Sequence, residues 1–135
     1  MQMKRAITLS AGALSLCLSA LVVSSPAAQA DNGACPANSF CLFEHDNYGG
    51  QRAVFTRTTR HLGGVHFPDG SHVGDKASSM INNRNRKVYI YEDGDCGGLL
   101  YVAKKESSDR DFSDNYNPTD PREVFDNKAS CVVFK

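Results

Sequence analysis

Helical periodicity is almost absent from this sequence. After residue 30, no stretch keeps apolar residues at positions i, i+3, i+4 and i+7 through three turns. Short runs rich in β-branched and aromatic residues occur instead, at residues 40–43, 52–55, 79–81, 88–91, 99–102 and 130–134, with clusters of Gly, Asn and Asp between them. This pattern predicts a small all-β sandwich or barrel.

Long apolar runs are also lacking, apart from one near the start of the chain. Lys4 and Arg5 precede the apolar segment 6–23, and Ala28-Gln29-Ala30 forms a small-residue cleavage pattern before Asp31. The run is short for a membrane anchor and small residues follow it, so we interpret residues 1–30 as a secretory signal peptide. Residues 31–135 are then expected to form one exported, extracellular domain.

An excess of basic residues is missing as well. The chain has 15 basic and 15 acidic residues, and two of the basic ones lie in the leader, so residues 31–135 carry 13 against 15, a net charge near −2. Nucleic acids and anionic membranes both attract basic surfaces. The balance of charge therefore argues against either of them as a partner.

Motifs of common enzyme sites are not found. The sequence contains no Gly-x-Ser-x-Gly, no His-Glu-x-x-His and no phosphate-binding glycine loop. A small domain built from hairpins also leaves little room for a deep pocket. We expect a monomer without enzymatic activity.

Two short motifs occur twice, in the same order. Residues 43–50 (Phe-Glu-His-Asp-Asn-Tyr-Gly-Gly) recur at 91–98 (Tyr-Glu-Asp-Gly-Asp-Cys-Gly-Gly), and Gly-Asp-Lys-Ala-Ser-Ser at 74–79 recurs as Asp-Asn-Lys-Ala-Ser-Cys at 126–131. Ordered repetition indicates two copies of one supersecondary unit, motif one at about 35–83 and motif two at about 88–135. In each copy a strand, a turn ending in Gly-Gly, a returning strand, a long connection and a last strand follow Greek-key order.

Four cysteines remain after residue 30, and no Cys-x-x-Cys pair of the kind that metal sites use is among them. An even number in a small exported chain indicates two disulfides, for which three pairings exist on paper. The repeat distinguishes them, because positions 48 and 79 of motif one are Tyr and Ser while the matching positions 96 and 131 are both Cys. Two positions that change to cysteine together are expected to touch. The repeat thus predicts the disulfide Cys96–Cys131 and leaves Cys35–Cys41.

Apolar strand positions should supply the interior. They are Phe43, Val54, Phe55, Ile81, Tyr89, Tyr91, Leu100, Val102, Val132 and Phe134. Because successive side chains of a strand point to opposite faces, not all of these are expected to be fully buried.

The repeated motifs resemble the paired signature of βγ-crystallin domains, an aromatic-x-x-x-x-aromatic-x-Gly element followed by Asn/Asp-Asn/Asp-x-x-Ser/Thr-Ser. The first element is matched by Phe43, Tyr48 and Gly50, and in motif two by Tyr91 and Gly98 with Cys96 in place of an aromatic residue. The second element is matched by Asp75, Ser78 and Ser79 after a departure at Gly74, and by Asp126, Asn127 and Ser130 with Cys131 at its end. The resemblance implies an all-β, βγ-crystallin-like sandwich of two Greek-key motifs.

A narrower resemblance lies in Cys-Pro-x-x-x-x-Cys-Leu-Phe-Glu at residues 35–44 and Asp-Lys-Ala-Ser-Ser at residues 75–79. With the leader, these are similar to the secreted bacterial peptidase-inhibitor family that has this fold, whose founding member inhibits thermolysin-type metalloproteases. The resemblance implies a secreted proteinaceous inhibitor that blocks a secreted metalloprotease with an exposed loop.

The segment 64–68 is the candidate for that loop. Thermolysin-like enzymes favour bulky apolar residues after the cut bond, so Val65 or Phe67, which flank His66, would enter such a pocket. In the alternative interpretation, Val65 and Phe67 anchor the loop by packing against the domain, as apolar loop residues usually do.

The superfamily resemblance also implies calcium binding. Site one would use Asp75 and Ser78, and site two Asp126, Asn127 and Ser130, with backbone carbonyls completing the oxygen ligands that Ca²⁺ prefers. Alternatively, the serines only hold the hairpins by hydrogen bonds and the Asp and Asn residues are ordinary turn residues. A calcium-binding structural or stress protein, or a killer-toxin-like antimicrobial protein, is therefore the alternative function.

Overall fold

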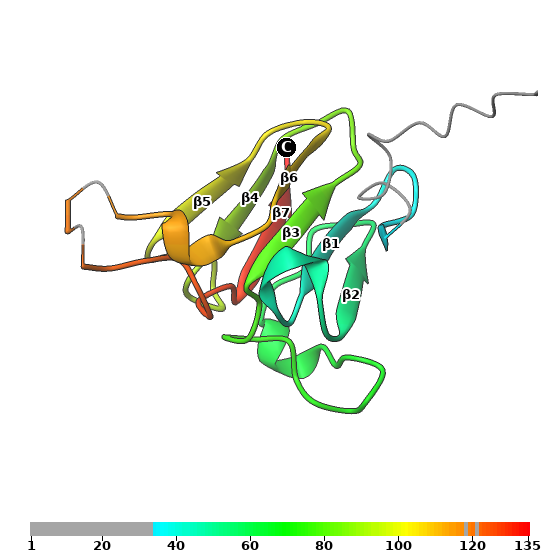
Figure 1. The fold of residues 1–135 in the computed structure, drawn as a ribbon, viewed down its shortest axis with the longest axis horizontal. Helices are drawn as coiled ribbons and strands as arrows, with labels where there is room; N and C mark the ends of the chain where they lie inside the picture. Colours follow the sequence, from blue (N-terminus) through cyan, green and yellow to red (C-terminus); the bar gives the residue numbers. More distant parts are fainter. Residues whose placement is uncertain (1–33, 118, 121) are drawn as a thin grey trace, which may run out of the picture.

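Residues 34–117, 119–120 and 122–135 are described by the computed structural model, and the predicted signal peptide 1–30 lies outside them. The described chain folds into two antiparallel sheets (Figure 1). The first has the order β2-β1-β3-β6, with β1 (Phe40–Phe43), β2 (Arg52–Phe55), β3 (Ser79–Asn82) and β6 (Ser107–Asp109). The second has the order β5-β4-β7, with β4 (Val88–Tyr91), β5 (Leu100–Ala103) and β7 (Cys131–Phe134). The predicted all-β sandwich is confirmed.

Each motif contributes a segment to the sheet of the other. Strand β6 belongs to motif two but pairs with β3 of motif one, where Met80 lies opposite Asp109 and Asn82 opposite Ser107. In return, Thr59 of motif one forms a bridge with Val132 of β7, with N–H···O distances of 2.8 Å in both directions. Strand β6 was not predicted, because the sequence Ser-Ser-Asp has no apolar alternation to mark it.

The two hairpins that carry the repeated motif have the same backbone. Tyr48 and Cys96 have φ values of 60° and 69°, and Gly50 and Gly98 have values of 69° and 73°. A Cβ atom at Gly50 would lie 2.6 Å from the His45 ring, and one at Gly98 would lie 2.9 Å from the carboxylate of Asp93. The hairpins therefore require glycine at both places, for the left-handed φ and for the close approach.

Both predicted disulfides are present. Cys35 is bonded to Cys41 and Cys96 to Cys131, with Cα–Cα distances of 5.9 and 5.2 Å. In motif one, Ser79 takes the place of Cys131: its hydroxyl accepts from the Tyr48 N–H at 3.1 Å and donates to the His45 carbonyl at 2.6 Å. The disulfide of motif two thus lies where motif one has two hydrogen bonds.

The interior lies between the sheets, where Phe40, Leu42, Ile90, Phe112 and Phe125 are almost completely buried. Phe55 and Val132 are buried there as predicted, while Phe43 and Ile81 are buried in a second cluster with Cys35 and Cys41. The prediction was wrong for Val54, Leu100 and Val102, which are 43, 42 and 38% exposed, and Tyr89, Tyr91 and Phe134 are half-buried. Strand alternation explains the errors: Ala53 and Phe55 point inward from β2, and Tyr101 and Ala103 from β5.

Candidate functional site

The connection between β2 and β3 ends in a tight hairpin, residues 66–72, which projects beyond the sandwich near η2 (Leu62–Gly64; Figure 1). His66 and His72 form its bridge, the N–H of Phe67 donates to the Ser71 carbonyl at 2.8 Å, and the N–H of Gly70 donates to the Phe67 carbonyl at 3.0 Å. These bonds fix the shape of the hairpin.

The tip of this hairpin carries an ionised carboxylate. Asp69 Oδ1 accepts from the hydroxyl of Ser71 at 2.7 Å and from its N–H at 2.9 Å. These two hydrogen bonds, the hydroxyl first, hold the pKa of Asp69 below its usual value, because they favour the charged form. The tip therefore keeps its negative charge well below neutral pH.

The three residues of the predicted inhibitory loop lie in different environments. Phe67 is only 2% exposed and belongs to the core, and Val65 is half-buried against it. The N–H of Val73 donates to the Val65 carbonyl at 2.8 Å, which ties the loop to the domain. His66 is exposed. Val65 and Phe67 thus anchor the hairpin, and a partner can reach His66 and the tip at residues 68–70.

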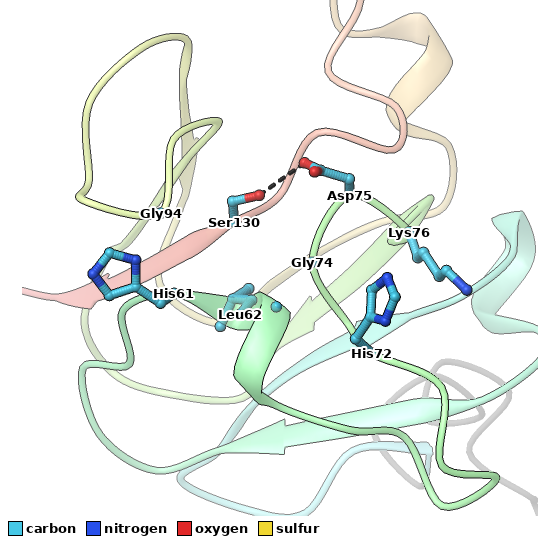
Figure 2. A pocket seen from close by; sticks show the side chains of 9 residues that line it. His61, Leu62, His72, Gly74, Asp75, Lys76, Gly94 and Ser130 are labelled. Atoms are coloured by element: carbon cyan, nitrogen blue, oxygen red, sulfur yellow. Dashed lines mark hydrogen bonds between the residues drawn. The ribbon is translucent and has the colours of Figure 1, made fainter.

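A cavity of about 430 Å³ lies beside this hairpin, between the two motifs (Figure 2). Its lining includes His61, His72, Asp75, Lys76, Gly94 and Ser130. Figure 2 shows the side chains of Asp75 and Ser130 pointing toward one another, with Lys76 and His72 on the side away from Ser130. The Ser130 hydroxyl donates to Asp75 Oδ1 at 2.8 Å.

This hydrogen bond joins two candidate calcium ligands that the sequence assigned to different sites. The sequence placed Asp75 with Ser78 and put Ser130 in the other site, whereas the fold brings Asp75 of motif one to Ser130 of motif two. The cause is the crossing of the motifs, because the N–H of Asp75 donates to the carbonyl of Ala129 at 3.0 Å.

The related position in motif two repeats the crossing. The N–H of Asn127 donates to the carbonyl of Ala77 at 3.0 Å, and Asn127 and Asp75 have matching left-handed φ values of 56° and 59°. The Asn127 side chain donates to Asp126 Oδ2 at 2.9 Å, while Asp126 Oδ1 is buried and has no hydrogen-bond partner. The crossing thus places Asn127 beside Ser78 of the other motif.

The donor chemistry at these two places suits a hard cation. Carboxylate, hydroxyl and amide oxygens are ligands that Ca²⁺ accepts, and the unpartnered oxygen of Asp126 is available for one. Within the described part of the chain, no three His, Cys, Asp or Glu side chains converge on one point. The residues present therefore fit a calcium site with few charged ligands.

A hairpin of motif two corresponds to residues 66–72. It is closed by a bridge between Tyr116 and Val124, and Asp120 Oδ1 accepts from the N–H of Arg122 at 3.0 Å, as Asp69 does from Ser71. Tyr116 is 59% exposed. Sequence reasoning did not single out this residue, because a lone tyrosine in an acidic connection has no periodic pattern around it.

None of the helices in the described ranges has the length and apolar character needed to cross a bilayer.

The fold is that of βγ-crystallin domains. A solved structure from work on the evolution of the eye lens βγ-crystallin domain fold is similar with a TM-score of 0.60 and 20% identity, covering 75% of this chain and 89% of its own. A βγ-crystallin from Ciona intestinalis gives a TM-score of 0.55 and 18% identity, with 72% and 99% covered, and one from an archaeon gives 0.53 and 20%, with 74% and 100% covered. Identities this low show a common fold alone.

The sequence itself gives the family. Residues 28–103, more than half of the chain, match peptidase inhibitor family I36. The chain belongs to this family, and the protein is a peptidase inhibitor rather than an enzyme. A comparison with curated proteins finds no match.

Proposed function

We propose that the protein is a secreted inhibitor of a thermolysin-type metalloprotease and that the hairpin 66–72 contacts the protease. Membership of the inhibitor family supports a protease as partner. Two disulfides support an exported protein, because disulfides persist in oxidising compartments.

The single observation that carries the choice of hairpin is its rigidity. Phe67 is held in the core, Val65 is tied to Val73, and hydrogen bonds close the tip. A loop already fixed in its bound shape loses little conformational entropy on binding. The fixed shape also hinders the chain from relaxing into the geometry that cleavage needs.

The chemistry at the tip suits a zinc enzyme. A catalytic zinc keeps one coordination position open for water or substrate, and a carboxylate oxygen is a ligand it accepts. Asp69 supplies an ionised carboxylate whose Oδ2 is not used by Ser71. In this proposal Asp69 faces the zinc and His66 contacts the rim of the protease cleft.

The test measures inhibition constants against a thermolysin-type protease with a fluorogenic peptide. Asp69→Asn keeps an oxygen that accepts from Ser71 but removes the charge, and we expect the inhibition constant to rise about tenfold or more, as for a residue at the centre of an interface. Asp120→Asn is the matched control on the corresponding hairpin and should leave the constant unchanged. His66→Ala should weaken inhibition as well.

Three results would contradict the proposal. In the first, the unaltered protein would leave thermolysin-type proteases active at micromolar concentration. In the second, Asp69→Asn and His66→Ala would both retain full potency. In the third, Asp120→Asn would be the variant that loses inhibition. The first rejects the target class, and the other two reject this hairpin.

Calcium binding is a second candidate function, favoured by the meeting of Asp75 with Ser130 and by the unpartnered buried oxygen of Asp126. Bound calcium would stabilise the fold by about 1.4 kcal/mol when its concentration is ten times the dissociation constant. We expect the melting temperature to rise by a few degrees in millimolar Ca²⁺ and less in Mg²⁺.

Asp75→Asn should reduce this calcium-dependent rise, while Asp114→Asn, at an exposed position on η3 (Phe112–Asp114), should leave it unchanged. Identical melting curves with and without 10 mM Ca²⁺, a concentration of about ten times a millimolar dissociation constant, would exclude the second function.

A further inference from the structure

The outer face of the sheet β5-β4-β7 is apolar and, in the described part of the chain, exposed on β5 and half-exposed on β4 and β7. The side chains that point away from the interior are Tyr89 and Tyr91 of β4, Leu100 and Val102 of β5, and Val133 of β7. The register makes one continuous surface of them, because Tyr89 lies between Val102 and Val133, and Tyr91 lies opposite Leu100. We call these five residues the β4 face.

The other sheet provides an internal comparison. The positions that correspond to Tyr89, Tyr91 and Val133 are Cys41, Phe43 and Ile81, whose exposed fractions are 0, 3 and 1%. They are covered by the segment that carries Ala34 and Cys35, with Tyr48 packed beside them. These three positions are therefore fully buried in motif one and only half-buried in motif two.

The two ends of the β4 face have opposite charge. At one end, Lys87 precedes the inward-pointing Val88, and Lys104 and Lys135 follow the inward-pointing Ala103 and Phe134. Strand alternation therefore turns the three lysines outward. The N–H of Lys135 donates to the Lys87 carbonyl at 3.3 Å, and its Nζ lies 5.7 Å from the centre of the Tyr89 ring.

The opposite end is acidic. The folded hairpin between β4 and β5 carries the exposed Asp93 and Asp95, and the disulfide from Cys96 to Cys131 ties it to β7. The other acidic residue there, Glu92, is already paired with Lys128 at 2.7 Å. The apolar surface thus lies between a lysine cluster and a pair of free aspartates.

We propose that the β4 face is the interface of a symmetric homodimer. A surface that is positive at one end and negative at the other is complementary to a second copy of itself turned by half a rotation, which places the lysines of each copy against Asp93 and Asp95 of its partner copy. The proposal concerns assembly and is independent of the target protease.

The size of the face sets the strength of the dimer. Strands lie about 4.8 Å apart, so a face of three four-residue strands is smaller than the roughly 800 Å² per partner of a standard interface. The dimer is therefore weak, with dissociation in the micromolar range, and sensitive to salt, because its charged ends are exposed to solvent.

The test is sedimentation equilibrium of the exported protein over a wide range of concentration. We expect the mass to approach twice that of one chain at high concentration, and to return toward one chain in high salt. Val102→Lys should prevent association. Val54→Lys is the matched control, since Val54 is the corresponding position on β2, is 43% exposed, and lies on the other sheet, where the neighbouring positions of β1 and β3 are already buried.

Charge reversal tests the arrangement of the two copies. Lys104→Glu or Asp95→Lys alone should weaken the dimer, and the two changes together should restore it. Val102→Lys should keep full inhibition of the protease, because the hairpin 66–72 lies elsewhere, so that failure of the dimer and failure of the proposed function give different results.

Several outcomes would overturn the proposal. The unaltered protein would remain a single chain at the highest attainable concentration, or Val54→Lys would disrupt association as strongly as Val102→Lys. A double charge reversal that does not recover the dimer affinity lost in the single variants would also overturn it. If the protein is monomeric and folded Val102→Lys loses inhibition, the β4 face binds the protease instead.

Discussion

At the residue scale, Asn82 connects three separate segments. Its side chain is completely buried, its Nδ2 donates to the carbonyls of Arg86 and Lys104 at 2.9 and 2.8 Å, and its Oδ1 accepts from the N–H of Arg84 at 3.1 Å. These bonds join the end of β3 to the linker between the motifs and to the β5–β6 turn. Because the Asn82 amide is itself buried, its polar atoms depend on these protein partners.

Replacement of Asn82 by Ala should lower the free energy of unfolding by about 2–4 kcal/mol, since three hydrogen bonds of a buried side chain are lost at once. Urea unfolding monitored by circular dichroism measures the loss. Asn85→Ala, at an exposed position three residues on, should change stability by less than about 0.5 kcal/mol. Equal effects of the two changes would contradict this role.

Tyr101 is a titratable residue that faces the core. Its ring packs against Phe112 and Phe125, and its hydroxyl donates to Asp109 Oδ2 at 2.7 Å. Burial, and then the hydrogen bond and charge of Asp109, raise the pKa of Tyr101 well above its usual value near 10. The folded protein therefore keeps the proton at pH values where the unfolded chain releases it.

A raised pKa in the folded state gives stability that is complete below about pH 10 and is lost above it, at about 1.4 kcal/mol per pH unit for one proton. Tyr101→Phe should thus be less stable than the unaltered protein at pH 7 but should lose less stability between pH 10 and pH 11. Melting temperatures across this range test the difference.

At the scale of elements, the two hairpins reach one geometry by different chemistry. Motif one holds Tyr48 to Ser79 by hydrogen bonds, and motif two joins Cys96 to Cys131 covalently. Apart from β6, which was not predicted, the strands were predicted to within one residue at either end. The side of each strand that faces the interior was not predicted, because the β5 sequence Leu-Tyr-Val-Ala has apolar residues on both faces.

Cys96→Tyr combined with Cys131→Ser recreates the motif-one arrangement in motif two. We expect the fold to persist with about 2–4 kcal/mol less stability, because the disulfide closes a segment of 35 residues in the unfolded chain. Cys35→Ala with Cys41→Ala removes a disulfide that closes a separation of only 6 residues. The loss of stability should be smaller, because closing a short loop costs the unfolded chain less entropy. Denaturant unfolding of both double variants gives the comparison, and a larger loss for the 35–41 pair would contradict it.

At the scale of the whole molecule, backbone hydrogen bonds join the two motifs. The N–H of Leu62 donates to the carbonyl of Ser130 at 2.9 Å, and the N–H of Phe112 donates to the carbonyl of Ser78 at 2.8 Å. Together with β6 and the Thr59 bridge, these contacts give each sheet a segment from the other half. The sheet of motif one includes β6 of motif two, while the sheet of motif two has three strands of its own and gains the bridge from Thr59.

Fragments 31–85 and 86–135 should therefore be largely unfolded when separate and should fold when mixed. Circular dichroism and amide spectra of each fragment and of the mixture test this. A stable fold of the first fragment alone would show that motif one does not need β6.

The sequence by itself determined the duplication, the all-β class, the disulfide pairing and the family resemblance, because each of these depends on residue types and spacings along the chain. Only the tertiary structure decided that Asp75 meets Ser130 rather than Ser78, that Ser107–Asp109 joins the sheet of the other motif, and that Phe67 is buried while Leu100 and Val102 are exposed. Local patterns fix which segments extend, but the partner of each strand and the face it buries depend on contacts between residues far apart in the chain.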